Sequence, residues 1–281
     1  LTFGYKMELE GDGRNSDEYV GSVSGSFGRV EIGVEDGAGD RLNSFYADSV
    51  FTNAADGAGF LFDYASTGVG VPDTGFGDTG DGFKVTYFTP TIAGFRAGAS
   101  YAASGADSGT SNPDLDDSGE GFEFGARYDN TFGNFTVGLG GSVAFFTDDR
   151  DEDVTYGGGV VLGFGGFKVS GIYGTDAKGD EAYEGFGLGL SYTTGPWLVG
   201  AEYAQNLTYD DRPDLDDAFG ISGEVVYSLA PGVRTGLVLE YASDTTADIL
   251  CTTTGPNCAA GDTLTTDSSG FAAGLMLGLT F

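Results

Sequence analysis

The sequence contains no histidine. Histidine is the commonest general base in enzymes and the commonest metal ligand in proteins. Its absence excludes a hydrolase built on a Ser-His pair. Pairs of carboxylates could in principle activate water, but the acidic residues are dispersed along the chain. We therefore expect that the protein is not an enzyme.

Cysteine is almost as rare. The two cysteines, Cys251 and Cys258, lie in a polar segment that offers none of the further ligands a metal site would need. We interpret them as a local disulfide formed in an oxidising compartment, with two free thiols as the alternative.

Basic residues are also scarce. The chain has 12 lysines and arginines against 43 aspartates and glutamates, which is a net charge of −31. Most non-specific affinity for nucleic acid comes from basic groups that neutralise phosphates, so this balance excludes nucleic acid as a partner. Dense carboxylates attract cations instead.

The long apolar runs of membrane-spanning helices are missing too. No run reaches about 18 apolar residues, so we expect no transmembrane helix. Residues 1–6 lack the charged and apolar regions of a signal peptide. An exported protein would have lost its signal peptide on maturation.

What the chain has instead is glycine and aromatic residues: 51 glycines, 22 phenylalanines and 15 tyrosines, with 7 prolines. This composition favours an all-β fold, and many segments show the two-residue alternation of a strand. The expected strands cover residues 2–10, 19–25, 29–35, 82–89, 94–103, 120–129, 134–147, 153–165, 167–175, 182–193, 197–207, 217–228, 233–243 and 270–281.

The connections between these strands are of two kinds that alternate along the chain, which predicts an antiparallel up-and-down meander. Long acidic loops form one kind. The other kind is a tight turn, expected at residues 26–28, 90–93, 130–133, 165–166, 194–196 and 229–232.

The two faces of each strand differ in polarity. Along residues 120–129, Phe122 and Phe124 share one face, whereas Glu123 and Arg127 share the other. Seven basic residues fall on polar faces: Lys6, Arg29, Lys84, Arg96, Arg127, Lys168 and Arg234. A soluble barrel is apolar inside. This pattern therefore predicts a closed transmembrane β-barrel with a polar interior and an exterior in contact with lipid.

Aromatic residues gather beside the tight turns, as in the interfacial girdle of such a barrel. The residues assigned to this girdle are Tyr87, Phe88, Phe95, Tyr128, Phe132, Phe135, Phe164, Phe167, Tyr192, Trp197 and Tyr227.

Residues 36–81 form the one long segment in which strict alternation fails. The segment carries eight aspartates against one cation, Arg41. Long loops inside a folded domain are usually functional. We interpret this segment as a plug or constriction folded into the lumen.

Two other loops share the motif Pro-Asp-Leu-Asp-Asp. Carboxylates at this density repel one another unless a hard cation bridges them, so we consider Ca²⁺ sites, with a solvated charged loop as the alternative. The candidate ligands are Asp114, Asp116, Asp117, Asp214, Asp216 and Asp217.

The opening residues 1–9, the strand at 29–34 that leads into the acidic segment, and the closing strand 271–281 with its terminal Phe281 carry a resemblance. The chain resembles a Gram-negative outer-membrane general-diffusion porin of the α-proteobacterial type. The resemblance implies a location in the outer membrane, contact with lipid and lipopolysaccharide, and a homotrimer. It implies a channel for small hydrophilic solutes that needs no cofactor.

Members of this family usually have sixteen strands, and their constriction loop follows the fifth strand rather than the third. Both differences disappear if the sequence begins inside the third strand of a longer protein, so we expect sixteen strands in a single barrel domain that includes residues 1–281. A true barrel of fourteen strands is the alternative.

By the same resemblance, the segment 36–81 narrows the pore, with its acids facing basic groups on the opposite wall. The residues assigned to the constriction are Asp40, Asp48, Asp56, Asp63, Glu8, Glu31, Lys6, Arg29 and Arg41. The residues assigned to the lumen wall are Lys84, Arg96, Arg127, Lys168 and Arg234. We expect a moderate preference for cations. The alternatives are a channel tuned to one substrate, or a non-conducting structural or adhesive barrel.

Overall fold

The structure is a computed structural model. It describes residues 1–9, 16–43, 79, 82–102, 120–147, 152–177, 183–209, 218–250 and 263–279. The candidate residues outside these ranges are Asp48, Asp56, Asp63, the six aspartates proposed for Ca²⁺, and both cysteines.

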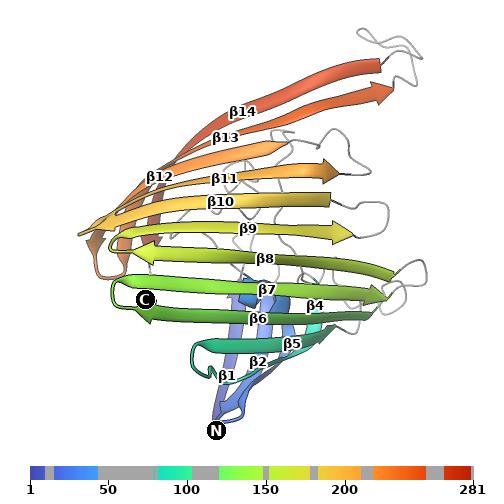
Figure 1. Cartoon of the computed structure of the whole chain (residues 1–281), viewed down its shortest axis with the longest axis vertical. Coiled ribbons are helices and arrows are strands. Elements are labelled where there is room, and N and C mark those ends of the chain that lie inside the picture. The colour runs from blue at the N-terminus through green and yellow to red at the C-terminus, as the bar shows by residue number, and fades with distance from the viewer. Residues whose placement is uncertain are drawn as a thin grey trace. The chain divides into compact units, whose positions relative to one another are not determined.

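The described residues form fourteen strands and one short helix, and the strand order in the sheet follows the chain order (Figure 1). The strands are β1 (Thr2–Leu9), β2 (Ser16–Gly25), β3 (Gly28–Glu35), β4 (Gly82–Phe88), β5 (Phe95–Ala102), β6 (Glu120–Phe132), β7 (Phe135–Thr147), β8 (Glu152–Phe164), β9 (Phe167–Ala177), β10 (Tyr183–Thr194), β11 (Trp197–Tyr209), β12 (Phe219–Ala230), β13 (Val233–Leu250) and β14 (Thr263–Leu279). The helix is α1 (Ala38–Asn43). The predicted all-β meander of fourteen visible strands is confirmed.

The chain divides into two compact units. One unit comprises residues 1–45, 75–160 and 174–179, and it contains α1 with β1 to β7. The other comprises residues 46–74, 161–173 and 180–281, and it contains β10 to β14. Within each unit the neighbouring strands pair antiparallel, as β6 with β7 in the first and β10 with β11 in the second. No helix among the described residues has the length and apolar character needed to cross a membrane.

The predicted tight turns are confirmed. The connections at 133–134, 165–166, 195–196 and 231–232 each contain a glycine with positive φ, at Gly133, Gly165, Gly195 and Gly232. A positive φ carries no steric cost for glycine, which allows two-residue hairpins between strands of matched twist.

The structure differs from the prediction at α1 and at the ends of β13 and β14. The sequence did not predict α1, which is short and carries Gly39 inside it; a helix of this length is stabilised by its packing rather than by propensity. In addition, β13 and β14 extend beyond the expected residues 233–243 and 270–281, because their pairing continues to Leu250 and Thr263. The added residues are rich in threonine, which favours strands.

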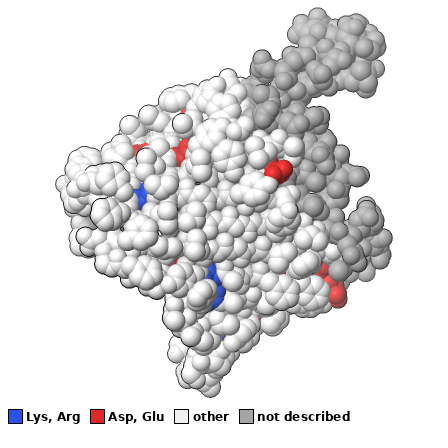
Figure 2. Space-filling view, in the orientation of Figure 1, with Lys and Arg blue, Asp and Glu red and all other residues white. Residues whose placement is uncertain are grey.

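The strands bury polar residues and expose apolar ones. On β6, Glu123 is fully buried, whereas Phe122 and Phe124 are 37% and 50% exposed. Figure 2 shows one face of the molecule, where uncharged residues cover the strands and few charged side chains appear. The predicted assignment of the faces is confirmed, and it suits strands that have lipid on one side and a polar interior on the other.

One member of the proposed aromatic girdle was assigned wrongly. Phe88 is fully buried and packs with Ala38 and Leu42 of α1. The reason is the alternation itself, since Phe88 shares the polar face of β4 with Lys84 and Thr86. Other aromatic residues beside the tight turns form pairs across the strands, including Trp197 with Tyr227 at 4.6 Å between ring centroids.

Candidate functional site

Helix α1 lies against the polar face of the first unit and is held there at its start. The backbone N–H of Ala38 donates to Oγ of Ser100 at 2.7 Å, and the N–H of Gly39 donates to Oε2 of Glu123 at 2.8 Å. The first N–H groups of a helix have no partner within the helix. Side chains of β5 and β6 therefore cap the first amides of α1.

Two glycines on the strands beneath α1, Gly98 and Gly125, leave space for the helix. A Cβ at Gly125 would lie 2.4 Å from the carbonyl oxygen of Ala38, and a Cβ at Gly98 would lie 2.9 Å from the Cβ of Ala38. Heavy atoms do not approach so closely without a shift of the backbone. These two glycines thus allow α1 to sit directly on β5 and β6, with Phe88 beside it.

Glu123 is the centre of a buried polar cluster. Its Oε1 accepts hydrogen bonds from the N–H of Thr79 at 2.8 Å and from the hydroxyl of Thr79. Lys84 Nζ lies 3.3 Å from the same oxygen and donates to Oγ1 of Thr79 at 3.1 Å. The side chains of Lys84 and Glu123 are 1% and 0% exposed, so each supplies the opposite charge that a buried ion needs.

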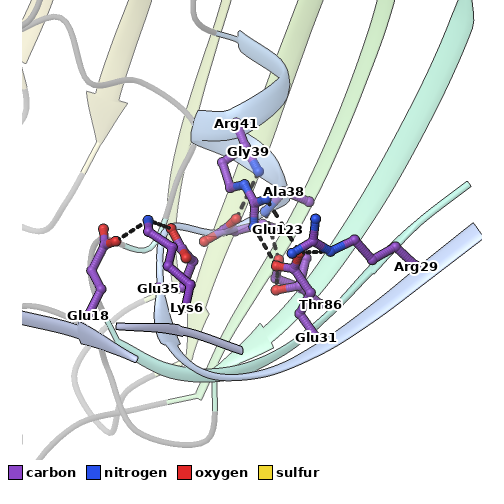
Figure 3. Close-up of polar contacts among 11 residues, drawn as sticks. Lys6, Glu18, Arg29, Glu31, Glu35, Ala38, Gly39, Arg41, Thr86 and Glu123 are labelled. Atoms are coloured by element: carbon purple, nitrogen blue, oxygen red, sulfur yellow. Dashed lines mark hydrogen bonds and ion pairs between the residues drawn. The ribbon is translucent and has the colours of Figure 1, made fainter. Parts of the chain in front are cut away.

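A second cluster surrounds Glu31, which is 2% exposed on β3 (Figure 3). Arg41 of α1 and Arg29 of β3 both form ion pairs with its carboxylate. Burial of Arg41 acts to lower its pKa, but the hydrogen bond and charge of Glu31, with the charges of Glu35 and Asp36, outweigh burial and raise the pKa above the ordinary value of arginine. Arg41 is therefore a permanent cation on α1.

A third arginine, Arg96, lies beside the Glu31 cluster because it stacks on the ring of Phe88. The guanidinium carbons of Arg41 and Arg96 lie 4.7 and 4.4 Å from the centroid of its ring. Both are within the range of a cation–π interaction. Arg96 also lies within electrostatic range of Arg29, Arg41 and Glu31. Three guanidinium groups thus share the field of one buried carboxylate.

Lys6 occupies a third cluster, between Glu18 and Glu35 (Figure 3). It forms an ion pair with Glu18, and its Nζ lies 2.9 Å from Oε1 of Glu35. Glu18, Glu35 and Asp36 also present carboxylate oxygens within 4.8 Å of one another, as a metal site does. The ammonium group of Lys6 already supplies positive charge there.

The polar face of the second unit is acidic. Glu202, Glu224 and Glu240 lie on the adjacent strands β11, β12 and β13, and each is no more than 4% exposed. Ser222 stands directly opposite Glu202 on one side and Glu240 on the other. Three buried glutamates therefore follow the wall across neighbouring strands.

Several other assigned residues have defined places. Asp40 lies on α1, and Glu8 lies on β1, although its side chain is outside the described part. Arg127 pairs with Asp129 at 2.7 Å beside a tight turn. Lys168 and Arg234 lie in the second unit, on β9 and β13, away in sequence from the clusters around α1. The structure thus brings together Arg29, Glu31 and Arg41.

Sequence reasoning did not single out Glu18, Glu35, Thr79, Ser100 or Glu123 as site residues. A signal for Glu123 was present, because glycines stand two residues before and after it on the same polar face. A Cβ at Gly121 would lie 2.8 Å from Cγ2 of Thr79, and one at Gly125 would collide with α1. The pattern Gly-Phe-Glu-Phe-Gly marks a carboxylate that has the side chain of Thr79 close on one side and the backbone of α1 close on the other.

Most of the chain matches a known protein family. The sequence model of the family described as Gram-negative porin matches residues 1–248. No curated protein sequence is significantly similar to the chain.

Solved structures are similar at low sequence identity. An anion-selective porin from Comamonas acidovorans has a TM-score of 0.60 at 18% identity and covers 96% of this chain and 81% of its own. The porin OmpF of Salmonella typhi, in complex with daunomycin, has a TM-score of 0.59 at 12% identity, with 93% and 78% covered. OmpT of Vibrio cholerae, folded in vitro, has a TM-score of 0.56 at 16% identity, with 94% and 80% covered. At these identities the likeness establishes the fold.

Proposed function

The chain belongs to the Gram-negative porin family, and on this premise we propose that it passes small hydrophilic solutes and ions by passive diffusion, with a moderate preference for cations. It is an outer-membrane diffusion channel and not an enzyme. The α-proteobacterial type and the sixteen-strand barrel stay predictions.

The observation that carries the proposal is the inverted polarity of the strands. Charged side chains such as Lys84, Glu123 and Glu202 lie on the inward face, and large apolar side chains lie on the outward face. A polar interior admits water and hydrated solutes, whereas an apolar exterior is stable only in lipid.

Two observations support the cation preference. The chain carries 43 acidic against 12 basic residues, which makes the average electrostatic potential around a pore negative. In addition, the wall of the second unit presents Glu202, Glu224 and Glu240. A ring or row of carboxylates is a common basis of cation selectivity.

We propose that the segment 36–81 narrows this channel. Asp40, with Asp48, Asp56 and Asp63, would supply the acidic side, and Lys6, Arg29 and Arg41 with the wall cations would supply basic groups. A transverse field between such groups orients polar solutes and disfavours apolar ones, which must displace ordered water.

A preference for anions is the second candidate. The gathering of Arg29, Arg41 and Arg96 around one carboxylate, Glu31, favours it. One matching structure is that of a porin described as anion-selective.

The assembly proposed for this chain is a homotrimer in contact with lipid and lipopolysaccharide. One matching structure is described as a trimer form. No cofactor is required for diffusion. The acidic loops with Asp114, Asp116 and Asp117, and with Asp214, Asp216 and Asp217, are proposed as Ca²⁺ sites. Calcium should then raise the thermal stability of the trimer, an effect that Mg²⁺ at equal ionic strength should not reproduce.

The experiment that tests the function is single-channel recording in a planar lipid bilayer with a KCl gradient. We expect large ohmic current steps and a reversal potential that lies toward the Nernst potential of potassium. A reversal potential on the chloride side would favour the second candidate, and steps blocked by one sugar or carboxylate would favour a substrate-tuned channel. The absence of steps from folded protein would reject the channel in favour of a structural barrel.

A further inference from the structure

We propose that Glu123 is a positioning residue that fastens both described ends of the constriction segment, Gly39 and Thr79, to the barrel wall. The proposal rests on the proposed function, since it assigns a role in the element that narrows the channel. Three elements meet at this carboxylate: α1, the residue Thr79, and strand β4 through Lys84.

Each carboxylate oxygen of Glu123 accepts a hydrogen bond from a different end of the constriction segment. Oε2 accepts from the N–H of Gly39, where the chain leaves the wall, at 2.8 Å. Oε1 accepts from the N–H of Thr79, where the chain returns, at 2.8 Å, and from the hydroxyl of Thr79. An ionised carboxylate accepts hydrogen bonds on both oxygens and donates none, so it suits two backbone donors from distant parts of the sequence.

The charge of Glu123 is also provided for. Its side chain is fully buried, and Lys84 Nζ lies 3.3 Å away. Lys84 donates to Oγ1 of Thr79 as well, at 3.1 Å. Burial of a carboxylate without a cation nearby carries a large cost in free energy, and the ammonium group of Lys84 offsets that cost.

The backbone around Glu123 is shaped to its carboxylate. A Cβ at Gly37 would lie 1.8 Å from Oε2 of Glu123, so a side chain there would displace the carboxylate. Gly121 and Gly125 stand on either side of Glu123 on β6 and leave room for Thr79 and for α1. We call the attachment of Gly39 and Thr79 to Glu123 the clamp. It depends on two backbone amides that donate to the carboxylate, on the ion pair with Lys84, and on three glycines that leave room for these contacts.

The test uses full-length protein folded in lipid nanodiscs and follows hydrogen–deuterium exchange by mass spectrometry. In Glu123→Gln, amide exchange should become about tenfold faster in peptides that cover residues 36–43 and 79–88, because hydrogen bonds to a charged acceptor are lost. Exchange in β6, β7 and β10 to β14 should not change. Unchanged exchange at both ends, or equal acceleration throughout the barrel, would overturn the proposal.

The matched control is Glu120→Gln on the same strand. Glu120 is exposed and accepts a hydrogen bond from the hydroxyl of Tyr101 at 2.8 Å. This variant should leave exchange at residues 36–43 and 79–88 at the wild-type rate. A similar acceleration in both variants would show a general effect of charge on β6 and would contradict a specific role for Glu123.

A variant in which the two charges are exchanged distinguishes hydrogen bonding to the amides of Gly39 and Thr79 from a simple ion pair between Glu123 and Lys84. The double variant Lys84→Glu with Glu123→Lys keeps opposite charges but offers the amides of Gly39 and Thr79 an ammonium donor instead of an acceptor. Fast exchange should persist, and wild-type protection would overturn the proposal. Heat-modifiable mobility on gels identifies folded protein. If the double variant does not fold, Glu123→Gln decides.

Current recordings on the same variants keep the two proposals apart. With Glu123→Gln, the noise of the open-channel current should rise relative to wild type and to Glu120→Gln. Wild-type protein without channel steps would reject the proposed function, yet the exchange data would still test the clamp.

Discussion

Arg96 differs from the other cations of the first unit in what it contacts. Arg29 and Arg41 share the carboxylate of Glu31, and Lys84 pairs with Glu123. Among the described residues, Arg96 stacks on Phe88 and makes no hydrogen-bonded ion pair. A charge that a close partner neutralises contributes little to the potential at a distance, whereas one without such a partner acts on passing ions.

The variant Arg96→Gln should therefore make the channel more selective for cations. The expected result is a shift of the reversal potential toward the potassium side in a KCl gradient, because one incompletely neutralised positive charge is removed. The control is the double variant Arg127→Gln with Asp129→Asn, which removes both charges of the 2.7 Å ion pair beside a tight turn and therefore leaves the net charge unchanged. Equal reversal potentials for wild type and Arg96→Gln would contradict this prediction.

At the scale of the element, α1 depends on the wall more than on its own sequence. It is six residues long, and its first amides are capped by Ser100 and Glu123 from other strands. Its apolar contact is small and consists of Ala38, Leu42 and Phe88. The position of α1 is thus set by how closely β5 and β6 let it approach.

Adding a methyl group to that wall should move α1 away from it. In Gly125→Ala, the new Cβ would lie 2.4 Å from the carbonyl oxygen of Ala38, which forces a shift of the helix. Under the proposed function α1 belongs to the segment that narrows the channel, so its displacement away from β6 should lower the single-channel conductance.

Gly200→Ala is the control for this variant. Gly200 lies on the inward face of β11, and its added Cβ would be in ordinary contact with Cγ of Glu224 at 3.4 Å. Its conductance should equal that of wild type. An unchanged conductance in Gly125→Ala would mean that α1 does not border the path of ions.

At the scale of the whole molecule, the outward face of the strands determines the environment. On the described strands, large apolar side chains of this face are exposed, including Leu188, Leu190 and Leu275. Aromatic pairs stand beside the tight turns, where a girdle would meet the lipid headgroups.

The single tryptophan provides a test of this orientation. Trp197 follows the turn at 195–196, is 47% exposed and packs against Tyr227. In bilayers, its fluorescence should be quenched more by lipids brominated near the headgroup than by lipids brominated near the chain end. Strongest quenching at the chain end, or free quenching by iodide in the water phase, would contradict an interfacial position.

The sequence by itself determined the strands, the turns and the faces. Alternation along β6 and the glycines at Gly133 and Gly165 are local signals, because side-chain direction in a strand and backbone freedom in a turn depend on neighbouring residues. The family resemblance followed from the same local patterns.

Only the tertiary structure decided which polar residues meet. Glu123 and Arg96 were correctly placed on polar faces, but their partners Gly39, Thr79 and Phe88 lie far away or were assigned elsewhere. These contacts depend on where the chain runs after β3, which no two-residue period encodes. The polarity of each strand face thus follows from neighbouring residues in the sequence. The attachment of α1 depends instead on contacts between segments distant in sequence.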